Sequence, residues 1–262
     1  MIRHSFGAAR AYIFPTKDGL GAAAADEAAA VIIAAVASAG WARIIVATGN
    51  SQWELIAALT RRLDIDWKAV EVFHMDEYIG IQSTHPSSFR NWIRTRIENV
   101  VHPAHVHYLA ADAGDLDREI QRYSKLLMRA PIDLALVGFG ENGHIAFNDP
   151  EVADFTDPAI VKRVTLDEAS RRQQVGEGHF AGLDSTPKQA LTLTCPALFR
   201  ARAWICCVAD TRKAEAVRNA LEGPISTACP ASIVRTHPNA SVYLDTSAAA
   251  LLRTLPELRE RI

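Results

Sequence analysis

The chain has 262 residues, with 28 Lys and Arg against 30 Asp and Glu, and a formal net charge of −2 at pH 7. This length is enough for one α/β domain with a substantial core. The shares of 49% hydrophobic and 22% charged residues are ordinary for globular proteins, which excludes disordered and fibrous classes. A near-neutral chain has no electrostatic footprint for nucleic acid or an anionic membrane, so we expect neither as a partner.

The first apolar stretch, residues 21–40, is mostly alanine and carries Asp26 and Glu27. It is too weakly hydrophobic to be expected to span a bilayer, and no basic segment with a following cleavage site marks a signal peptide. The cysteines are Cys195, Cys206, Cys207 and Cys229, without C-x-x-C spacing. We therefore expect a cytoplasmic protein with reduced, buried thiols.

Predicted strands and helices alternate along almost the whole chain. In chain order they are a helix over 22–39, a strand over 43–47, a helix over 52–63, a strand over 70–74, a helix over 86–97, a strand over 106–109, a helix over 115–129, strands over 132–137 and 161–166, a helix over 168–176, a strand over 203–208, a helix over 211–221 and a strand over 241–244. The pattern predicts one α/β domain over residues 1–262, a doubly wound, mostly parallel, Rossmann-like sheet. Residues 150–187 are predicted to form a flap or lid.

Three loops at the carboxyl ends of predicted strands carry most of the chemistry. They are residues 48–51, 74–80 and 138–150. Ligands of open α/β sheets bind outside the carboxyl ends of the strands, near the point where strand order reverses. We therefore expect the three loops to share one edge and to form one site.

The first loop, Thr48-Gly49-Asn50-Ser51, has the composition of a phosphate cradle. Gly49 allows backbone N–H groups to approach an anion, Ser51 can donate its hydroxyl, and a helix start follows. The loop lacks the G-x-x-x-x-G-K-[ST] spacing of a Walker nucleotide-binding loop. An ordinary tight turn with a helix cap is the alternative interpretation.

In the second loop, Asp76 and Glu77 directly follow a strand. A carboxylate there, partly desolvated by Met75 and Tyr78, can act as a general base with a raised pKa. The alternative is a helix-capping or solvated acidic pair.

The third loop contains Gly138-x-Gly140-x-x-Gly143, the spacing of a dinucleotide-binding fingerprint. A true fingerprint opens a long helix, whereas Pro150 stops any helix here within about a turn, so we expect no nicotinamide cofactor. The loop instead presents His144 with Asn142 and Asp149, a histidine held by polar neighbours for proton transfer. The alternative is a structural histidine whose ring nitrogens are hydrogen-bonded within the fold.

Three histidines near one predicted strand suggest a metal site. His102, His105 and His107 include an alternating pair, which would share one strand face. No nearby carboxylate or cysteine completes the ligand set, so we expect no metal.

Several motifs follow one another in the order of a known family. They include Ala47-Thr48-Gly49-Asn50-Ser51, Phe73-His74-Met75-Asp76-Glu77-Tyr78, and Gly143-His144-Ile145-Ala146-Phe147-Asn148-Asp149-Pro150. Over about residues 43–245 the chain resembles the glucosamine-6-phosphate deaminase (isomerase) family, which is similar in fold to 6-phosphogluconolactonases and ribose-5-phosphate isomerases. The resemblance implies isomerisation of glucosamine 6-phosphate with loss of ammonia, giving fructose 6-phosphate, without a cofactor.

The resemblance also implies roles for individual residues. Asp76 would move a proton between C2 and C1 of the opened sugar, and His144 would transfer a proton at the ring oxygen. Asn142 and Asp149 match the partners of that histidine, where family members usually have Asp and Glu. The phosphate ligands implied are Gly49, Asn50, Ser51, Arg171 and Lys213.

Two departures from the family pattern bear on activity. The first loop reads Gly-Asn-Ser-Gln where the family commonly has Gly-Ser-Thr-Pro. Asn142 cannot stabilise an imidazolium as a carboxylate would. We hypothesise slower ring opening or a different sugar phosphate.

Three alternative functions remain open at this point. The first is an isomerase-deaminase for another hexosamine phosphate. The second is a 6-phosphogluconolactonase, although that family has Asp-Glu-Arg where this chain has Asp76-Glu77-Tyr78. The third is a sugar-phosphate sensor, although no helix-turn-helix is evident. The sequence leaves the oligomeric state open, including a homo-oligomer.

Overall fold

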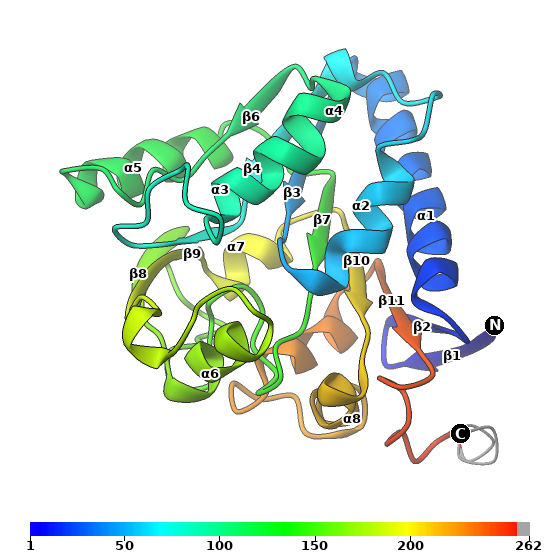
Figure 1. Ribbon diagram of the computed structural model, residues 1–262. Helices are drawn as coiled ribbons and strands as arrows, with labels where there is room; N and C mark the ends of the chain where they lie inside the picture. The colour runs from blue at the N-terminus through cyan, green and yellow to red at the C-terminus, as the bar shows by residue number, and fades with distance from the viewer. Residues whose placement is uncertain (256–262) are drawn as a thin grey trace.

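An eight-stranded sheet runs through the centre of the computed structural model, which describes residues 1–255 (Figure 1). Its strands are β1 (Ile2–Phe6), β2 (Ala9–Phe14), β3 (Ala42–Val46), β4 (Val70–His74), β6 (His105–His107), β7 (Leu134–Val137), β10 (Ala203–Val208) and β11 (Ala240–Asp245). They lie in the order β1-β2-β11-β10-β7-β3-β4-β6. The hairpin of β1 and β2 is antiparallel and the other neighbours are parallel, so the predicted fold class is confirmed.

Helices cover both faces of this sheet. The α-helices of the described residues are α1 (Lys17–Ala39), α2 (Trp53–Leu59), α3 (Phe89–Ile93), α4 (Asn99–Val101), α5 (Leu116–Leu127), α6 (Glu168–Gly176), α7 (Cys195–Phe199) and α8 (Ala214–Glu222), of which α6 lies away from this sheet. Successive strand residues enter opposite clusters: Leu136 packs with the cluster under α1 and α2, and Val137 with the cluster under α5 and α8. Cys206 and Cys207 are divided in the same way, and all four cysteines are free and buried.

The strand order reverses between β3 and β7, which are parallel neighbours at the centre of the sheet. From β3 the chain continues outward to β4 and β6, whereas from β7 it continues outward on the other side to β10 and β11. The loops that follow β3 and β7 therefore flank a topological switch point, where open α/β sheets bind ligands.

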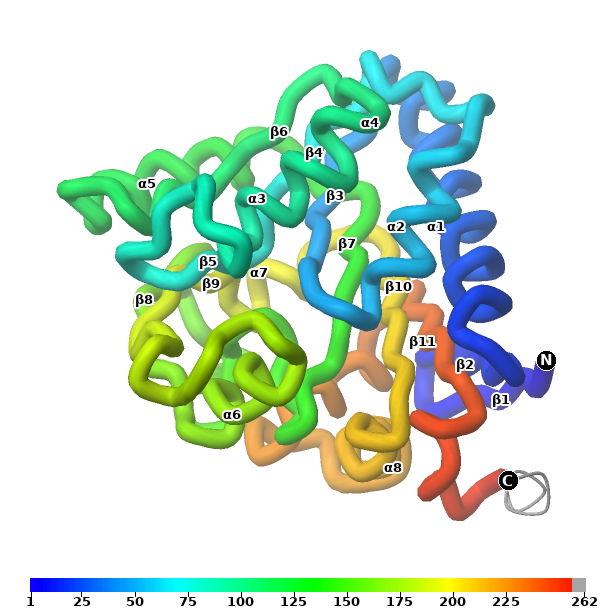
Figure 2. Tube along the Cα trace, in the orientation of Figure 1, coloured from blue at the N-terminus to red at the C-terminus, as the bar shows by residue number. Residues whose placement is uncertain are grey.

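A small antiparallel sheet contains β5 (Asp76–Tyr78), β9 (Gln189–Leu193) and β8 (Val161–Thr165). The expectation that residues 161–166 join the parallel sheet is therefore wrong. This sheet lies, with α6, on the opposite side of the molecule from the β1–β2 hairpin (Figure 2). The segment 150–187, predicted as a flap, supplies β8 and α6. An aromatic cluster that includes Tyr78, Phe89 and Phe147 packs beneath it.

Helix α1 is long and apolar enough to cross a membrane by length and composition, contrary to the expectation from its alanines. The burial of α1 in the protein core gives another explanation for its apolar composition. Leu20, Ile32 and several small residues between them are buried in the cluster shared with α2 and the sheet. A Cβ on Gly21 would lie 2.4 Å from the Cβ of Glu54 on α2, so the two helices are in close contact. Helix α1 is a core helix in this fold.

Candidate active site

A cavity at the carboxyl edge of the parallel sheet is lined by residues from all three predicted loops. These are Thr48, Gly49, Asn50 and Ser51 from the first, Met75 and Asp76 from the second, and Gly138, Phe139, Gly140, His144, Ala146 and Phe147 from the third. The loop after β10 adds Asp210, Arg212 and Lys213, and the end of α6 with its following turn adds Gln173, Gln174, Glu177 and His179. The predicted convergence of the loops is therefore observed.

Asp76 lies on β5 at the wall of this cavity. It is 6% exposed, and its carboxylate has no hydrogen bond to any described residue. Desolvation by burial, with a contribution from the charge of Glu77, raises the pKa of Asp76 well above its ordinary value. A carboxyl group in this environment is suited to accept and return a proton.

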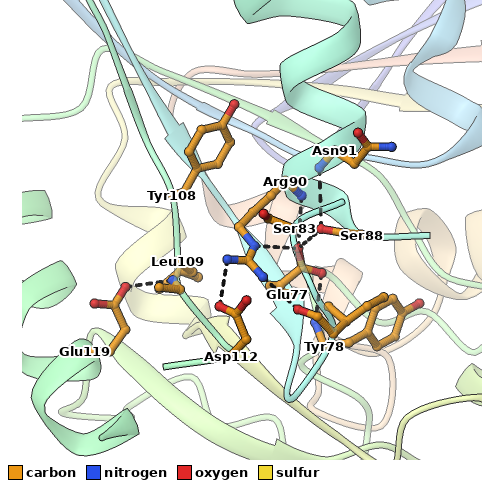
Figure 3. Close-up of polar contacts among 12 residues, drawn as sticks. Glu77, Tyr78, Ser83, Ser88, Arg90, Asn91, Tyr108, Leu109, Asp112 and Glu119 are labelled. Atoms are coloured by element: carbon orange, nitrogen blue, oxygen red, sulfur yellow. Dashed lines mark hydrogen bonds and ion pairs between the residues drawn. The ribbon is translucent and has the colours of Figure 1, made fainter. Parts of the chain in front are cut away.

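Glu77 points away from Asp76, because neighbouring strand residues face opposite sides. Its buried carboxylate accepts hydrogen bonds from the backbone N–H groups of Tyr78, Phe89 and Arg90, at 3.0–3.2 Å, and from the Ser88 hydroxyl at 2.6 Å (Figure 3). The acidic pair is thus divided: Glu77 caps α3, as the alternative interpretation proposed, and Asp76 faces the cavity.

Arg90 extends the network around Glu77. Its guanidinium lies 3.4 Å from Glu77, donates to Asp112 at 2.8 Å and donates to the Ile81 carbonyl at 2.7 Å (Figure 3). These contacts fix the loop that follows β5 to α3 and thereby fix the backbone that carries Asp76.

His144 is held through one ring nitrogen. Its Nδ1 lies 3.0 Å from Asp149 Oδ1 and 2.9 Å from Ser170 Oγ, and Ser170 also donates to Asp149 at 2.6 Å. Burial alone would raise the pKa of Asp149, but hydrogen bonds from its neighbours, led by His144, lower it to about 2. A charged Asp149 therefore orients the imidazole and leaves Nε2 as the ring nitrogen available for proton transfer.

Gly140 is in close contact with the imidazole. A Cβ added there would lie 2.2–2.4 Å from three atoms of the His144 ring. The second glycine of the fingerprint-like motif therefore makes room for His144 rather than for a pyrophosphate, and the next α-helix, α6, begins only at Glu168.

The Asn142 side chain is not hydrogen-bonded to the imidazole ring of His144. Its Oδ1 accepts from the backbone N–H of His144 at 3.0 Å, and its Nδ2 donates to Asp149 at 3.1 Å and to Asp167 at 3.0 Å. The amide bridges two carboxylates, which a carboxylate could not do. The structure thus gives a physical reason for Asn at this position, while Asp149 supplies the charge beside the imidazole.

The first loop is tied to the sheet across the switch point. Gly49 has a φ of 106°, a backbone conformation that favours glycine. Gln52 donates to Ser51 Oγ at 3.2 Å and to the carbonyls of Val137 and Cys207 at 3.3 and 3.4 Å. Gln52 therefore connects the loop with both β7 and β10.

Two cations reach the cavity next to this loop. Lys213 Nζ lies 3.5 Å from Glu177, and Arg212 lies 3.2 Å from Glu141. Burial lowers the pKa of Lys213, and the nearby Glu177 charge opposes that shift.

Arg171 does not join the other residues expected to hold phosphate. Its guanidinium donates to the backbone carbonyls of Leu183 and Thr186 and is not among the groups that line the cavity. Within this structure Arg171 stabilises the turn after α6.

Several polar residues at the site were not predicted from the sequence. They are Ser170, Gln173, Gln174, Glu177, His179 and Arg212. Most lie in or after α6, where polar residues are also typical of an ordinary surface helix. The closely spaced Gln173-Gln174-x-x-Glu177-x-His179 was the available signal.

The three histidines considered for a metal lie on or beside β6, away from the cavity lining. His107 Nε2 lies 3.5 Å from Glu71, and the ring of His105 stacks on that of His107. Among residues 1–255 no group of three or more His, Cys, Asp or Glu side chains has an arrangement that could hold a metal ion.

A sequence model of the family described as glucosamine-6-phosphate isomerases and 6-phosphogluconolactonases matches residues 15–243. The chain belongs to this family. A glucosamine-6-phosphate deaminase of Arthrobacter sp. (strain FB24) is 33% identical over 247 residues, with 92% of each chain covered. Another, from Exiguobacterium sibiricum, is 32% identical over 192 residues, which cover 73% of this chain and 74% of the relative. The resemblance inferred from the motifs is confirmed.

Solved structures have the same fold. The structure of a monomeric glucosamine-6-phosphate deaminase gives a TM-score of 0.83 at 29% identity, over 92% of this chain and 99% of that one. A 6-phosphogluconolactonase from Shewanella baltica OS155 gives a TM-score of 0.74 at 20% identity, over 94% and 98% of the two chains. The second similarity shows the fold alone.

The raised pKa of Asp76 predicts that the activity of the protein declines on the acid side at a higher pH than an ordinary aspartate would cause. A base must be deprotonated, so kcat/KM falls as the pH decreases through the raised pKa, above the ordinary value of about 4 for Asp. Glu77→Gln removes a like charge beside Asp76 and should move this decline to lower pH. The measurement is the pH profile of both proteins, with circular dichroism at each pH to establish that they remain folded. A decline that does not move would contradict the assignment to Asp76.

The bridging role of Asn142 predicts that Asn142→Asp impairs the enzyme rather than improving it. A carboxylate there loses the hydrogen bonds to Asp149 and Asp167, worth about 1.5–3 kcal/mol each, and adds like-charge repulsion. We expect kcat with a closed-ring sugar phosphate to fall by about tenfold or more. The exposed Asn99→Asp is the matched control. Unchanged or faster turnover by Asn142→Asp would contradict this interpretation.

Proposed function

We propose that this protein is a cytoplasmic amino-sugar-phosphate isomerase-deaminase that converts glucosamine 6-phosphate and water to fructose 6-phosphate and ammonia. The observation that carries the proposal is that one cavity holds two groups. Asp76 is a desolvated carboxylate without a hydrogen-bond partner among residues 1–255, and His144 is an imidazole oriented by Asp149. The relatives named as glucosamine-6-phosphate deaminases support the choice of substrate.

Ring opening is the first step that these residues can promote. His144 transfers a proton at the ring oxygen through Nε2, while Nδ1 keeps its contact with the Asp149 carboxylate. Because Asp149 is charged, it stabilises the protonated imidazole at the moment the proton is shared. The product of this step is the open-chain aldehyde.

Asp76 then moves the proton that defines the isomerisation. It removes the hydrogen of C2, the electron pair forms the C1–C2 double bond, and the aldehyde oxygen is protonated. Return of the proton to C1 gives an iminium at C2, where water adds and ammonia leaves. A desolvated carboxyl with a raised pKa suits both directions of the transfer, since its proton affinity is closer to that of the carbon acid.

The phosphate remains at the other end of the cavity. We propose that the backbone of Gly49 and Asn50, the Ser51 hydroxyl and the Lys213 ammonium hold it, which gives binding energy for positioning C1 and C2. Arg171 is left out of this set because its guanidinium is engaged with backbone carbonyls.

The test is release of ammonia and fructose 6-phosphate from glucosamine 6-phosphate by the purified protein. Galactosamine 6-phosphate and 6-phosphogluconolactone are assayed alongside. We expect turnover of glucosamine 6-phosphate. Turnover of only one of the other two compounds would contradict the proposed substrate, and sugar-phosphate binding without any turnover would favour a sensor.

Asp76→Asn separates catalysis from binding. We expect it to lower kcat by about 10³-fold or more, because the amide cannot accept the C2 proton, while binding of glucosamine 6-phosphate measured by calorimetry persists. The exposed Asp154→Asn is the control. Retained activity in Asp76→Asn would contradict the assignment of the base.

A further inference from the structure

A protein carboxylate lies beside the ammonium group assigned to the phosphate of the substrate. Glu177 Oε1 is 3.5 Å from Lys213 Nζ, each side chain is 7% exposed, and both line the cavity. The carboxylate therefore occupies part of the space around Lys213 Nζ in which an anionic ligand would bind.

The position of Glu177 is built into the end of α6. Its N–H donates to the Gln173 carbonyl at 2.8 Å, and the Gln173 side chain donates to its carboxylate at 2.9 Å. His179 Nε2 lies 3.5 Å from the other carboxylate oxygen. Burial alone would raise the pKa of Glu177, but His179 and Lys213 contribute to lowering it to about 2, so the group is ionised when the cavity is empty.

The other charged side chains at this end of the cavity are paired as well. Arg212 lies 3.2 Å from Glu141, and Asp210 lies 2.6 Å from Lys17. Each of the two cations that line the cavity thus already has a carboxylate partner, and a dianionic phosphate would enter a region with little uncompensated positive charge.

We propose that Glu177 is an internal anion that competes with the phosphate of the substrate for Lys213 and so sets the affinity of the site for phosphate. The inference rests on the proposed function only in taking Lys213 as a phosphate ligand. A phosphate oxygen hydrogen-bonded to Nζ would lie within about 6–7 Å of Glu177 in the present arrangement, and like charges this close in a partly buried site repel strongly.

Competition of this kind has a use in the empty site. Burial favours the neutral form of Lys213, and the nearby Glu177 charge opposes that effect. The Glu177 charge therefore favours the charged form of the lysine in the empty site, and by weakening phosphate binding it also speeds release of a phosphorylated product.

The test is binding of inorganic phosphate to the full-length protein by calorimetry, comparing wild type with Glu177→Gln. The neutral amide removes the competing charge, so we expect the Kd for phosphate to fall by about tenfold or more. The KM for glucosamine 6-phosphate should fall as well. Glu177→Ala, which removes the side chain altogether, should also bind phosphate more tightly and serves if the amide variant does not fold.

Glu168→Gln is the matched control, because it makes the same charge change on the same helix at an exposed residue paired with Arg172. We expect its phosphate affinity to equal that of wild type. Unchanged or weaker phosphate binding by both Glu177 variants would overturn the proposal and would show that Glu177 only orients Lys213. Because the readout is heat of binding, absence of deaminase activity would count against the proposed function and leave this test intact.

Discussion

The buried carboxylate of Glu77 is the group on which the geometry of the site depends most. It accepts hydrogen bonds from the backbone N–H of Tyr78 on β5 and, at the start of α3, from two backbone N–H groups and a hydroxyl. It also lies within ion-pair distance of Arg90. Since Glu77 is fixed on one side of β5, the alternation of the strand places Asp76 on the other side, in the cavity. The same charge contributes to the raised pKa of Asp76. Glu77 thus fixes the direction of Asp76 and adds to the basicity that burial gives it.

The small antiparallel sheet supplies the second half of the site. Strand β5 pairs with β9, and β9 pairs with β8, which leads into α6. Ser170 on α6 contacts both members of the His144–Asp149 pair, and the Tyr78 hydroxyl donates to Gln174 at 2.6 Å. The segment predicted as a flap is therefore joined to the base through β5 and to the histidine through Ser170.

The sequence was sufficient to predict the parallel sheet and the edge where the site lies. Apolar runs such as residues 132–137 identify strands covered on both faces, and loops at their carboxyl ends must share one edge. The antiparallel sheet was harder to predict, because β5 has only three residues and the polar residues of β8 are equally compatible with a parallel strand.

The outcome for Arg171 shows another limit of prediction from sequence. A motif places the residue in the chain, but the direction of its guanidinium depends on the carbonyls of Leu183 and Thr186, which tertiary folding brings nearby. Glu177 and His179 were missed for a related reason, because only the packing of the turn after α6 against the cavity distinguishes them from surface residues.

Deuterium exchange at C1 of fructose 6-phosphate is the sharpest test of the role of Asp76, because it follows the proton that Asp76 is proposed to move. The protein is incubated with fructose 6-phosphate and ammonium in D₂O, and C1 is observed by NMR. We expect incorporation of deuterium by the wild type and none by Asp76→Asn. Equal incorporation by the two proteins, or none by the wild type, would contradict that role.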